Sequence, residues 1–435
     1  MKRSIGRAAG AILMALVLMP SVAGAVLYID INAPGGKQLP LAVGNFVVIS
    51  GGATLSQGIP KMLEADLELT GLFDLVPRDA HLEVVKPVHF SGVNLDFPAW
   101  KTVGAEAVVI GKVEGRGDQL AIEMRVYDAT QGTLIVGKRY SGTPRQLPQI
   151  VHKFANEIVY AFTGVRGIFG TEIAFTARNG RGKEVYIVGM DGQGLRKATN
   201  NRSFNLFPRW SPDGRWLSFT SFRTGVPVIY LHNPDTGVEK EIVRAGDAKS
   251  PGGFSPDGDW LYYSVSNAGN SDIRRVRVVG GATEKVAGGW GLEVSPTVSP
   301  DGKRIAFASD RGGSPHIYVK DIGSDEERRV SQPGVYATSP CWSPSGNRIA
   351  YTSRAGGRFA VYMVAPDGSD PRLVASSPDG DCEDPSFSPD GRQLVYSMRK
   401  RDYSVLKIIS LDGRRERTLV SGLGDVGSPA WSPAR

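Results

Sequence analysis

Histidine and cysteine are scarce in this chain of 435 residues, which has 5 His and 2 Cys. The histidines are scattered, and Cys341 and Cys382 lack the spacing of metal ligands, so the sequence indicates no metal site and no cofactor. The motifs G-x-S-x-G and H-E-x-x-H, the P-loop and a helix-opening G-x-G-x-x-G are also missing. These absences argue against the enzyme classes that those motifs mark and favour a non-enzymatic function. For the two cysteines, a disulfide and two separate buried thiols both stay open.

Long apolar runs are missing as well, except at the N-terminus. There "MKRSIGR" is basic, "AAGAILMALVLMPSV" is apolar but short, and Ala23-Gly24-Ala25 fits a cleavage site. This order predicts a secretory signal peptide over residues 1–25. The alternative, a retained membrane anchor, needs about 20 apolar residues. Cleavage would lower the formal charge from +7 to +4. No run of basic residues concentrates that charge, so a nucleic-acid partner is not indicated.

A ten-residue pattern recurs through the second half of the chain. It reads "WSPDGRWLSF", "FSPDGDWLYY", "VSPDGKRIAF", "WSPSGNRIAY" and "FSPDGRQLVY", and the chain ends on "PAWSPAR". The first residue of each copy, here called the leader, is Trp210, Phe254, Val298, Trp342, Phe387 and finally Trp431, at steps of 44, 44, 44, 45 and 44 residues. A fixed period of about 40–50 residues is typical of solenoids and propellers.

The chemistry of one repeat distinguishes these two architectures. Ser-Pro-Asp-Gly favours a tight turn, in which the Asp side chain would cap backbone amides. Apolar residues then alternate with period two, as in Leu217 and Phe219, which indicates half-buried strands. Each repeat predicts about four short antiparallel strands and no helix, which excludes helical arrays. Four-stranded units arranged radially form a β-propeller.

The truncated ending predicts how the propeller closes. One period before Leu217 and Phe219 stand Ile173 and Phe175, in a unit that lacks its own leader, while Trp431 is a leader without a following unit. Together they complete one blade and make six. Pairing of the last strand with the first unit would close the ring and protect its edges.

Residues 26–163 have a different pattern, with strand-like stretches, an amphipathic helix in "IPKMLEADLELTG" and a second helix that starts at a Thr143–Gln146 capping box and stops at Gly164. We therefore expect an N-terminal mixed α/β domain over residues 26–163, a linker over 164–169, and a closed six-bladed β-propeller over 170–435. We further expect an exported monomer that does not insert into a membrane.

Several landmarks resemble the TolB family, periplasmic components of the Tol–Pal envelope system. They are "LYIDI" after the cleavage site, "DFPAWKTVGAEAVVIGKV", "HKFANEIVYAFTGVRGIF", the repeats and the terminal "PAWSP", in this order. The resemblance implies a periplasmic, non-enzymatic scaffold that maintains outer-membrane integrity and envelope constriction during cell division. It also implies two partners, the peptidoglycan-associated lipoprotein Pal and the inner-membrane protein TolA.

The resemblance also implies where these partners bind. TolA would bind the mature N-terminus, whose alternating side chains suit strand addition to a partner sheet; this segment is Val26, Leu27, Tyr28, Ile29, Asp30, Ile31 and Asn32. Alternatively, it is simply the first strand of the α/β domain. Pal would bind the loops before the leaders, with the candidates Asn205, Lys249, Ser250, Glu293, Thr338, Glu383 and Asp384. A proline stands two residues before most leaders, but Pro251 stands three before Phe254, so a different shape is expected there.

Two other functions stay open. A secreted propeller hydrolase or lyase acting on envelope glycans or peptides would need several ionisable side chains converging on a metal in the channel. A glycan-binding lectin is indicated only by the aromatic residues of the same loops, Phe204, Phe207, Trp290 and Tyr336.

Overall fold

The structure of the chain is a computed structural model. It describes residue 29 and residues 38–51, 55–90, 95–244, 248–267, 269–289, 291–332 and 336–434. The predicted signal peptide, most of the predicted TolA segment and Trp290 therefore lie outside the described residues. No described helix has the length and apolar character needed to cross a membrane.

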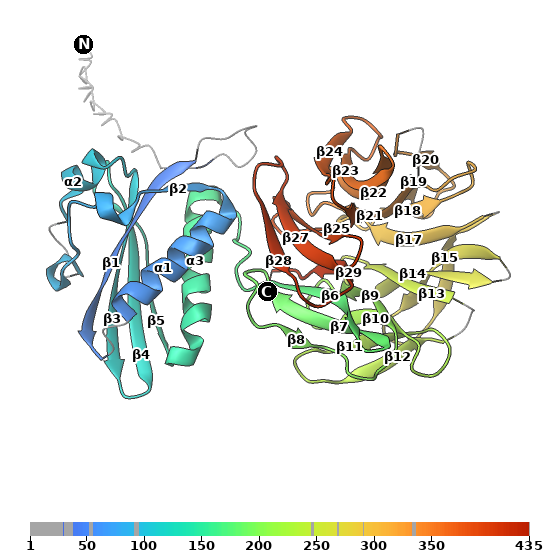
Figure 1. Cartoon of the computed structure of the whole chain (residues 1–435), viewed down its shortest axis with the longest axis horizontal. Coiled ribbons are helices and arrows are strands. Elements are labelled where there is room, and N and C mark those ends of the chain that lie inside the picture. The colour runs from blue at the N-terminus through green and yellow to red at the C-terminus, as the bar shows by residue number, and fades with distance from the viewer. Residues whose placement is uncertain are drawn as a thin grey trace, which may run out of the picture.

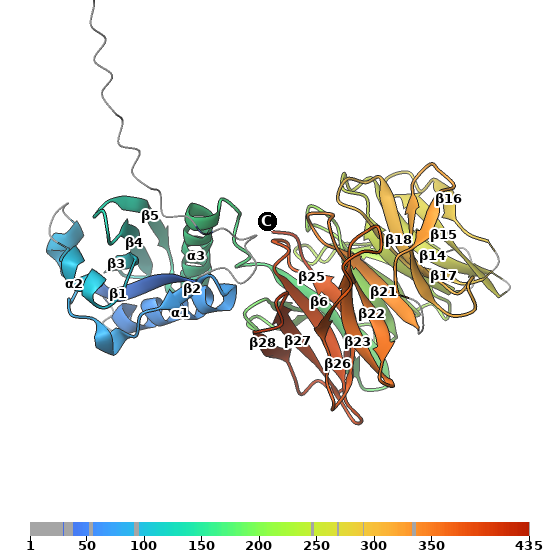
Figure 2. The same cartoon turned by 90° about the horizontal axis from the view of Figure 1, so that it is seen from above.

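The N-terminal region is a mixed α/β layer structure (Figures 1 and 2). Its five-stranded sheet has the order β2-β1-β3-β4-β5, in which β1 pairs in parallel with β2 and β3 and the other pairs are antiparallel. The strands are β1 (Leu39–Ser50), β2 (Phe73–Leu75), β3 (Ala107–Arg116), β4 (Gln119–Asp128) and β5 (Leu134–Gly142). The helices are α1 (Leu55–Thr70), α2 (Phe97–Thr102) and α3 (Leu147–Thr163), with 3-10 turns at Arg78–Ala80, Pro87–Phe90 and Pro144–Gln146.

Alternation along the strands gives the sheet two apolar faces. Leu41 and Val43 of β1 face the cluster that contains α1 and α3, while Ala42 faces Trp100 of α2. The predicted end of α3 at Gly164 and the Thr143–Gln146 capping box are confirmed, but the box precedes a 3-10 turn, and the α-helix itself begins at Leu147. Gln146 accepts a hydrogen bond from the Thr143 backbone N–H at 2.9 Å, and Gly164 ends the helix with φ of 69°.

The rest of the chain forms six four-stranded antiparallel sheets around a ring (Figure 1). Blade one consists of β9 (Asn205–Trp210), β10 (Leu217–Ser221), β11 (Val228–His232) and β12 (Glu239–Val243). Blade two consists of β13 (Ala248–Phe254), β14 (Trp260–Asn267), β15 (Asn270–Arg277) and β16 (Thr283–Ala287). Blade three consists of β17 (Glu293–Val298), β18 (Arg304–Ser309), β19 (His316–Asp321) and β20 (Glu327–Arg329). Blades four and five are β21 (Ala337–Trp342), β22 (Ile349–Ala355), β23 (Arg358–Val364) and β24 (Arg372–Ala375); β25 (Asp381–Phe387), β26 (Gln393–Arg399), β27 (Ser404–Ser410) and β28 (Glu416–Val420).

The sixth blade confirms the predicted closure. It combines β29 (Val426–Trp431), from the C-terminus, with β6 (Glu172–Asn179), β7 (Gly182–Gly189) and β8 (Arg196–Lys197). Trp431 is opposite Ile173 in the antiparallel pair. The Trp431 indole N–H donates to Thr171 Oγ1 at 2.9 Å, and Phe175 stacks on Tyr186 of the next strand. The ring is thus sealed by hydrogen bonds and by apolar packing.

The repeated turn follows each leader. In the first blade Gly214 has φ of 67°, the Asp213 carboxylate accepts from the Arg215 backbone N–H, and Ser211 Oγ accepts from that of Trp216. In the later blades, the carboxylates of Asp257, Asp301 and Asp390 likewise accept a hydrogen bond from the backbone N–H two residues further along the chain. The prediction that these aspartates cap turn amides is confirmed.

Candidate functional site: the propeller mouth and the domain junction

The innermost strands of the six blades, β9, β13, β17, β21, β25 and β29, all run in the same direction around the central channel. We call the end of the channel where these strands begin the mouth. The loops before the leaders gather there, while the Ser-Pro-Asp-Gly turns lie at the opposite end. The turns between the third and fourth strands of each blade also lie at the opposite end, because the strands alternate in direction.

A β-bulge bends five of the six inner strands near the mouth. In each, the residue three before the leader adopts a left-handed backbone and precedes a proline. These residues are Phe207, Ser295, Ser339, Asp384 and Ser428, with φ between 49° and 57°. A non-glycine residue in this region carries backbone strain, which such bulges tolerate where they aim a side chain. The five bulges therefore set the direction of the side chains at the same position of five neighbouring inner strands.

Blade two departs from this pattern, as expected from the position of Pro251. No described residue of β13 has a positive φ, and its ladder with β14 is interrupted between Pro251 and Phe254. Glycine is required next to it, because a Cβ on Gly252 would lie 2.1 Å from the backbone oxygen of Pro296 on blade three.

Large apolar side chains are exposed at the mouth. Phe204, Tyr336 and Leu292, each six residues before a leader, are 48%, 41% and 43% exposed, and Phe207 is 37% exposed. Tyr336 packs edge-on against Phe359, with ring centroids 5.6 Å apart. Exposed aromatic groups on a rigid frame are typical of protein-binding surfaces.

Three of the predicted Pal-facing residues are buried just beneath the mouth. Asn205 donates to Glu184 at 2.9 Å, Lys249 Nζ donates to the Pro227 carbonyl at 2.8 Å, and Glu293 pairs with Arg311 at 2.7 Å. Asn205 and Glu293 have no exposed area. Their polar groups therefore brace the loops from inside, and any effect on a partner would pass through loop shape.

The other four predicted residues, Ser250, Thr338, Glu383 and Asp384, are half-buried. Asp384 accepts hydrogen bonds from Ser339 at 2.7 Å and Ser428 at 3.3 Å, and so links three neighbouring blades. Glu383 pairs with Arg399 at 2.9 Å, yet burial raises the pKa of Glu383 to about 7, helped by the nearby Asp384 charge. Burial thus outweighs the partly exposed arginine.

Arg209 is a channel residue that the sequence analysis did not single out. It stands one residue before its leader and donates to the Pro208 carbonyl at 2.8 Å. Burial lowers the pKa of Arg209, while the charge of Asp384, two inner strands away, opposes this shift. The repeat contained the signal, because the same position in the other blades is Gly253, Thr297, Cys341, Ser386 or Ala430, none of them charged at neutral pH.

Metal ligands are not grouped in this region. Within the described residues, no set of three or more His, Cys, Asp or Glu side chains is arranged to hold a metal ion. Cys341 and Cys382 are both free thiols, and burial raises the pKa of each, that of Cys382 to about 11.

Of the predicted TolA segment, Ile29 is the one residue that the structure describes. Its backbone N–H donates to the Phe162 carbonyl at 2.7 Å, and its side chain is buried in the cluster that contains α3. Ile29 is thus held at the C-terminal end of α3, and the other residues of the segment lie outside the described residues.

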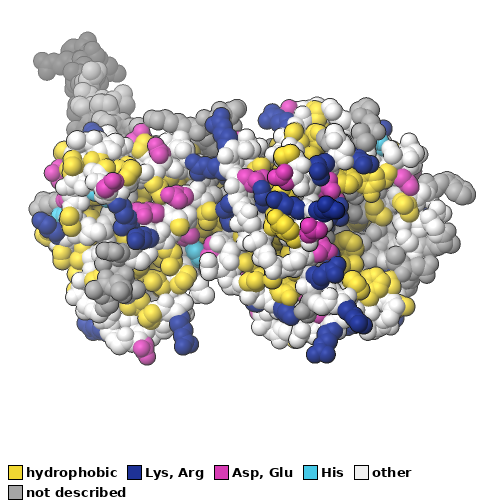
Figure 3. Space-filling model, in the orientation of Figure 1, with side chains coloured by type: hydrophobic (Ala, Val, Ile, Leu, Met, Phe, Trp, Pro, Cys, Tyr) yellow, Lys and Arg dark blue, Asp and Glu magenta, His cyan; other side chains and the backbone are white. Residues whose placement is uncertain are grey.

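The two domains meet at blades five and six, away from the mouth. The Gln393 side chain donates to the Leu69 carbonyl at 2.8 Å and Arg415 donates to the Glu68 carbonyl at 3.1 Å. Both acceptors belong to the last turn of α1, whose carbonyls have no partner within the helix. Propeller side chains therefore cap α1, and the cation suits its negative end. Figure 3 shows the molecule narrowing at this junction.

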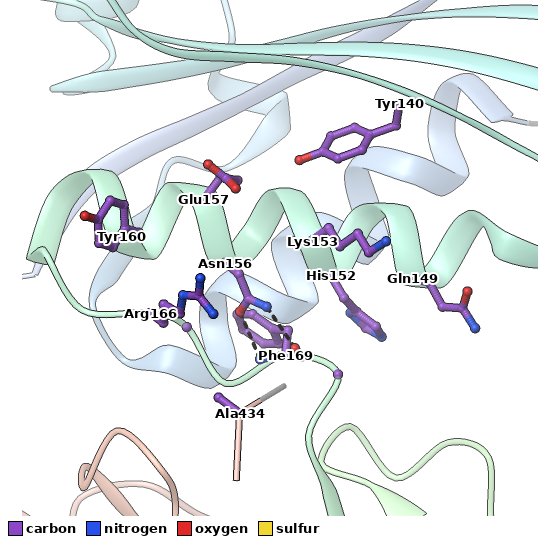
Figure 4. A pocket seen from close by; sticks show the side chains of 12 residues that line it. Tyr140, Gln149, His152, Lys153, Asn156, Glu157, Tyr160, Arg166, Phe169 and Ala434 are labelled. Atoms are coloured by element: carbon purple, nitrogen blue, oxygen red, sulfur yellow. Dashed lines mark hydrogen bonds between the residues drawn. The ribbon is translucent and has the colours of Figure 1, made fainter. Parts of the chain in front are cut away.

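A groove of about 650 Å³ runs along α3 at the junction. Figure 4 shows Gln149, His152, Lys153 and Asn156 on the helix, Tyr140 above them on β5, and Arg166 and Ala434 on the other side. The Asn156 amide holds the linker by two hydrogen bonds to the backbone of Phe169, at 2.8 and 3.0 Å. This groove could not be predicted from sequence patterns, because its residues come from β5, α3, the linker and the C-terminus.

Comparison with known families accounts for both domains. The model of the TolB β-propeller domain matches residues 159–435, more than half of the chain, and that of the TolB amino-terminal domain matches residues 27–135. The chain belongs to the TolB family. The TolB of Acinetobacter baumannii, known from a crystal structure, superposes with a TM-score of 0.80 at 26% identity, covering 94% of this chain and 100% of that one.

Curated relatives carry the name Tol-Pal system protein TolB. That of Syntrophus aciditrophicus is 36% identical over 240 residues, which are 53% of either chain. That of Bordetella pertussis is 31% identical over 226 residues, which are 51% of this chain and 49% of the relative. The matches thus span about half the length of these TolB relatives.

Proposed function

We propose that the chain is a periplasmic, non-enzymatic scaffold of the Tol–Pal system, which binds a Pal-like lipoprotein at the propeller mouth and a TolA-like inner-membrane protein through residues 26–32. Through these contacts it supports outer-membrane integrity and envelope constriction during division. The observation that carries the proposal is the mouth itself, where exposed aromatic side chains stand on strands braced by a buried polar network. Membership of the TolB family supports the same assignment.

The chemistry of the mouth suits protein recognition. Phe204 and Tyr336 offer large, stiff apolar contacts, and Glu383, Asp384 and Arg209 offer charges whose positions are fixed by neighbours. A rigid surface of this kind binds without losing much side-chain entropy. The N-terminal segment suits a different mode, strand addition, because its apolar and polar side chains alternate.

Titration calorimetry with the soluble domains of the two partners tests the proposal. Tyr336→Ala and Phe204→Ala should weaken Pal binding at least tenfold and leave TolA binding unchanged, because their side chains lie at the mouth. Removal of residues 26–32 should abolish TolA binding and leave Pal binding intact. The matched control is Val279→Ala, because Val279 is 85% exposed in the turn between β15 and β16, at the end opposite the mouth.

Pal binding that is unchanged in both mouth variants would overturn the assignment of the mouth. TolA binding that survives the deletion would overturn the assignment of the segment.

A further inference from the structure

His152 of α3 lies between carboxylates from the two domains. Its Nδ1 lies 2.8 Å from Asp66 Oδ2 on α1, and its Nε2 lies 3.3 Å from Asp191 Oδ2 in the turn after β7. The ring also stacks on Phe169 of the linker, with centroids 6.1 Å apart. A neutral imidazole has one N–H and can satisfy one carboxylate, whereas the charged ring donates to both. The geometry therefore fits the protonated form.

The surroundings favour the same form. Burial of Asp66, which is 3% exposed, works against the ion pair, because it raises the pKa of Asp66 more than the contact with His152 lowers it. Burial alone would lower the pKa of His152, but its hydrogen bonds to Asp191 and Asp66 and their charges raise it to about 9. The contact with His152 in turn holds the pKa of Asp191 below its usual range, against the effect of burial.

Other charged groups surround this contact. Lys153 follows on α3 itself and Arg166 stands on the linker; both are exposed in the groove. On the propeller side, Arg417 of β28 donates to the Met190 carbonyl, and its charge acts on Asp191. These three groups are cations. Two carboxylates also lie nearby, but Glu157 pairs with Lys138 at 3.1 Å and Asp390 accepts from Ser388 and Arg392 of its own turn, so neither replaces Asp191 beside His152.

The remaining polar contacts described between the domains keep their charge from pH 6 to pH 10. Gln393 does not titrate, and an arginine such as Arg415 stays charged. The His152–Asp191 contact is thus the one that responds to pH among these.

We propose that His152 is a pH-dependent latch that holds the propeller turn at Asp191 against the N-terminal domain and releases it when the imidazole loses its proton. A free histidine titrates near pH 6.5, so the latch is fully engaged below that pH. Its contribution disappears as the pH rises through about 9. Loss of the His152–Asp191 contact should change the equilibrium between docked and undocked domains by roughly tenfold or more between these two pH values.

A role of His152 within the N-terminal domain alone, as partner of Asp66, is the alternative. The variant Asp191→Asn separates the two, because it removes only the acceptor on the propeller. Asp367→Asn is its matched control. Asp367 occupies the corresponding turn of blade four and accepts the same backbone N–H two residues on, at 2.9 Å against 3.0 Å for Asp191.

The first measurement is the pKa of His152 in the full mature chain, from NMR with labelled histidine. Comparison with His152→Gln assigns the signal among the five histidines. We expect a pKa near 9 in the parent chain and in Asp367→Asn, and a fall of at least one unit in Asp191→Asn. An unchanged pKa in Asp191→Asn would overturn the proposal.

The second measurement is the distance between the domains, from paired spin labels at Lys101→Cys on α2 and Glu326→Cys in the turn between β19 and β20. Both positions are exposed, and the unlabelled native thiols are checked in the parent chain. We expect one narrow distribution at pH 6 that broadens at pH 10, a broad one at both values in Asp191→Asn, and no pH response in His152→Gln. Distributions that stay narrow in all variants would also overturn it.

Discussion

At the scale of single residues, Glu383 shows how burial can set the charge at the mouth. Burial raises its pKa to about 7, so the folded protein favours the protonated form relative to an unfolded chain in which glutamate titrates near 4.3. The stability that protonated Glu383 provides is therefore fully present below pH 4.3 and is lost as the pH rises through 7.

Glu383→Gln should accordingly stabilise the fold at pH 8 by about 1–2 kcal/mol relative to its effect at pH 5, since the amide never ionises. Urea unfolding at the two pH values measures the difference. The exposed Glu326→Gln is the control and should show no such dependence. If Glu383→Gln instead destabilises the fold more at pH 8 than at pH 5, relative to the parent chain, the ion pair with Arg399 dominates.

The same strands show what the sequence could not predict. Counting by alternation from the leader puts positions five residues before it, such as Asn205 and Glu293, on the channel side. The bulge three residues before the leader adds one residue to that count, so the side chains of Asn205 and Glu293 lie on the same buried side of the strand as the leader. Turn aspartates were predictable because their role depends on local spacing alone, whereas the bulge depends on how neighbouring blades pack.

At the scale of elements, β29 is the strand that closes the ring. Trp431→Ala should destabilise the propeller by about 3–5 kcal/mol, because it removes a buried aromatic side chain and the hydrogen bond to Thr171. A weakened β29 also exposes the edge of β6, so we expect association of the variant as well. Urea unfolding and light scattering measure the two effects.

The control is Trp216→Ala, in the turn of blade one. This side chain is half-buried and lies beneath Lys240, and it takes no part in the closure. Trp216→Ala should destabilise the propeller less than Trp431→Ala does, and it should cause no association. A Trp431→Ala variant within about 1 kcal/mol of the parent chain would contradict the role of the closure in stability.

At the scale of the whole molecule, the sequence predicted each domain but not how they meet. The period of 44 residues determines the number of blades, and the orphan leader at Trp431 determines the closure. The junction instead depends on backbone carbonyls of α1 that accept from propeller side chains more than 300 residues away, and no spacing in the sequence marks such a contact. As a result, the described contacts between the two domains lie on blades five and six, at the end of these blades that is opposite the mouth.

The strength of that junction is measurable. Gln393→Ala leaves the Leu69 carbonyl without its donor, which costs about 1–3 kcal/mol where the group stays buried. Apolar packing is continuous from the N-terminal sheet through α3 to blades five and six, so the parent chain should unfold in one calorimetric transition. Gln393→Ala should split it into two. Arg348→Ala is the matched control, because Arg348 has the same position in blade four but bonds to Asp370 within its own blade, and it should keep one transition. A single transition in both variants would mean that apolar contact alone couples the domains.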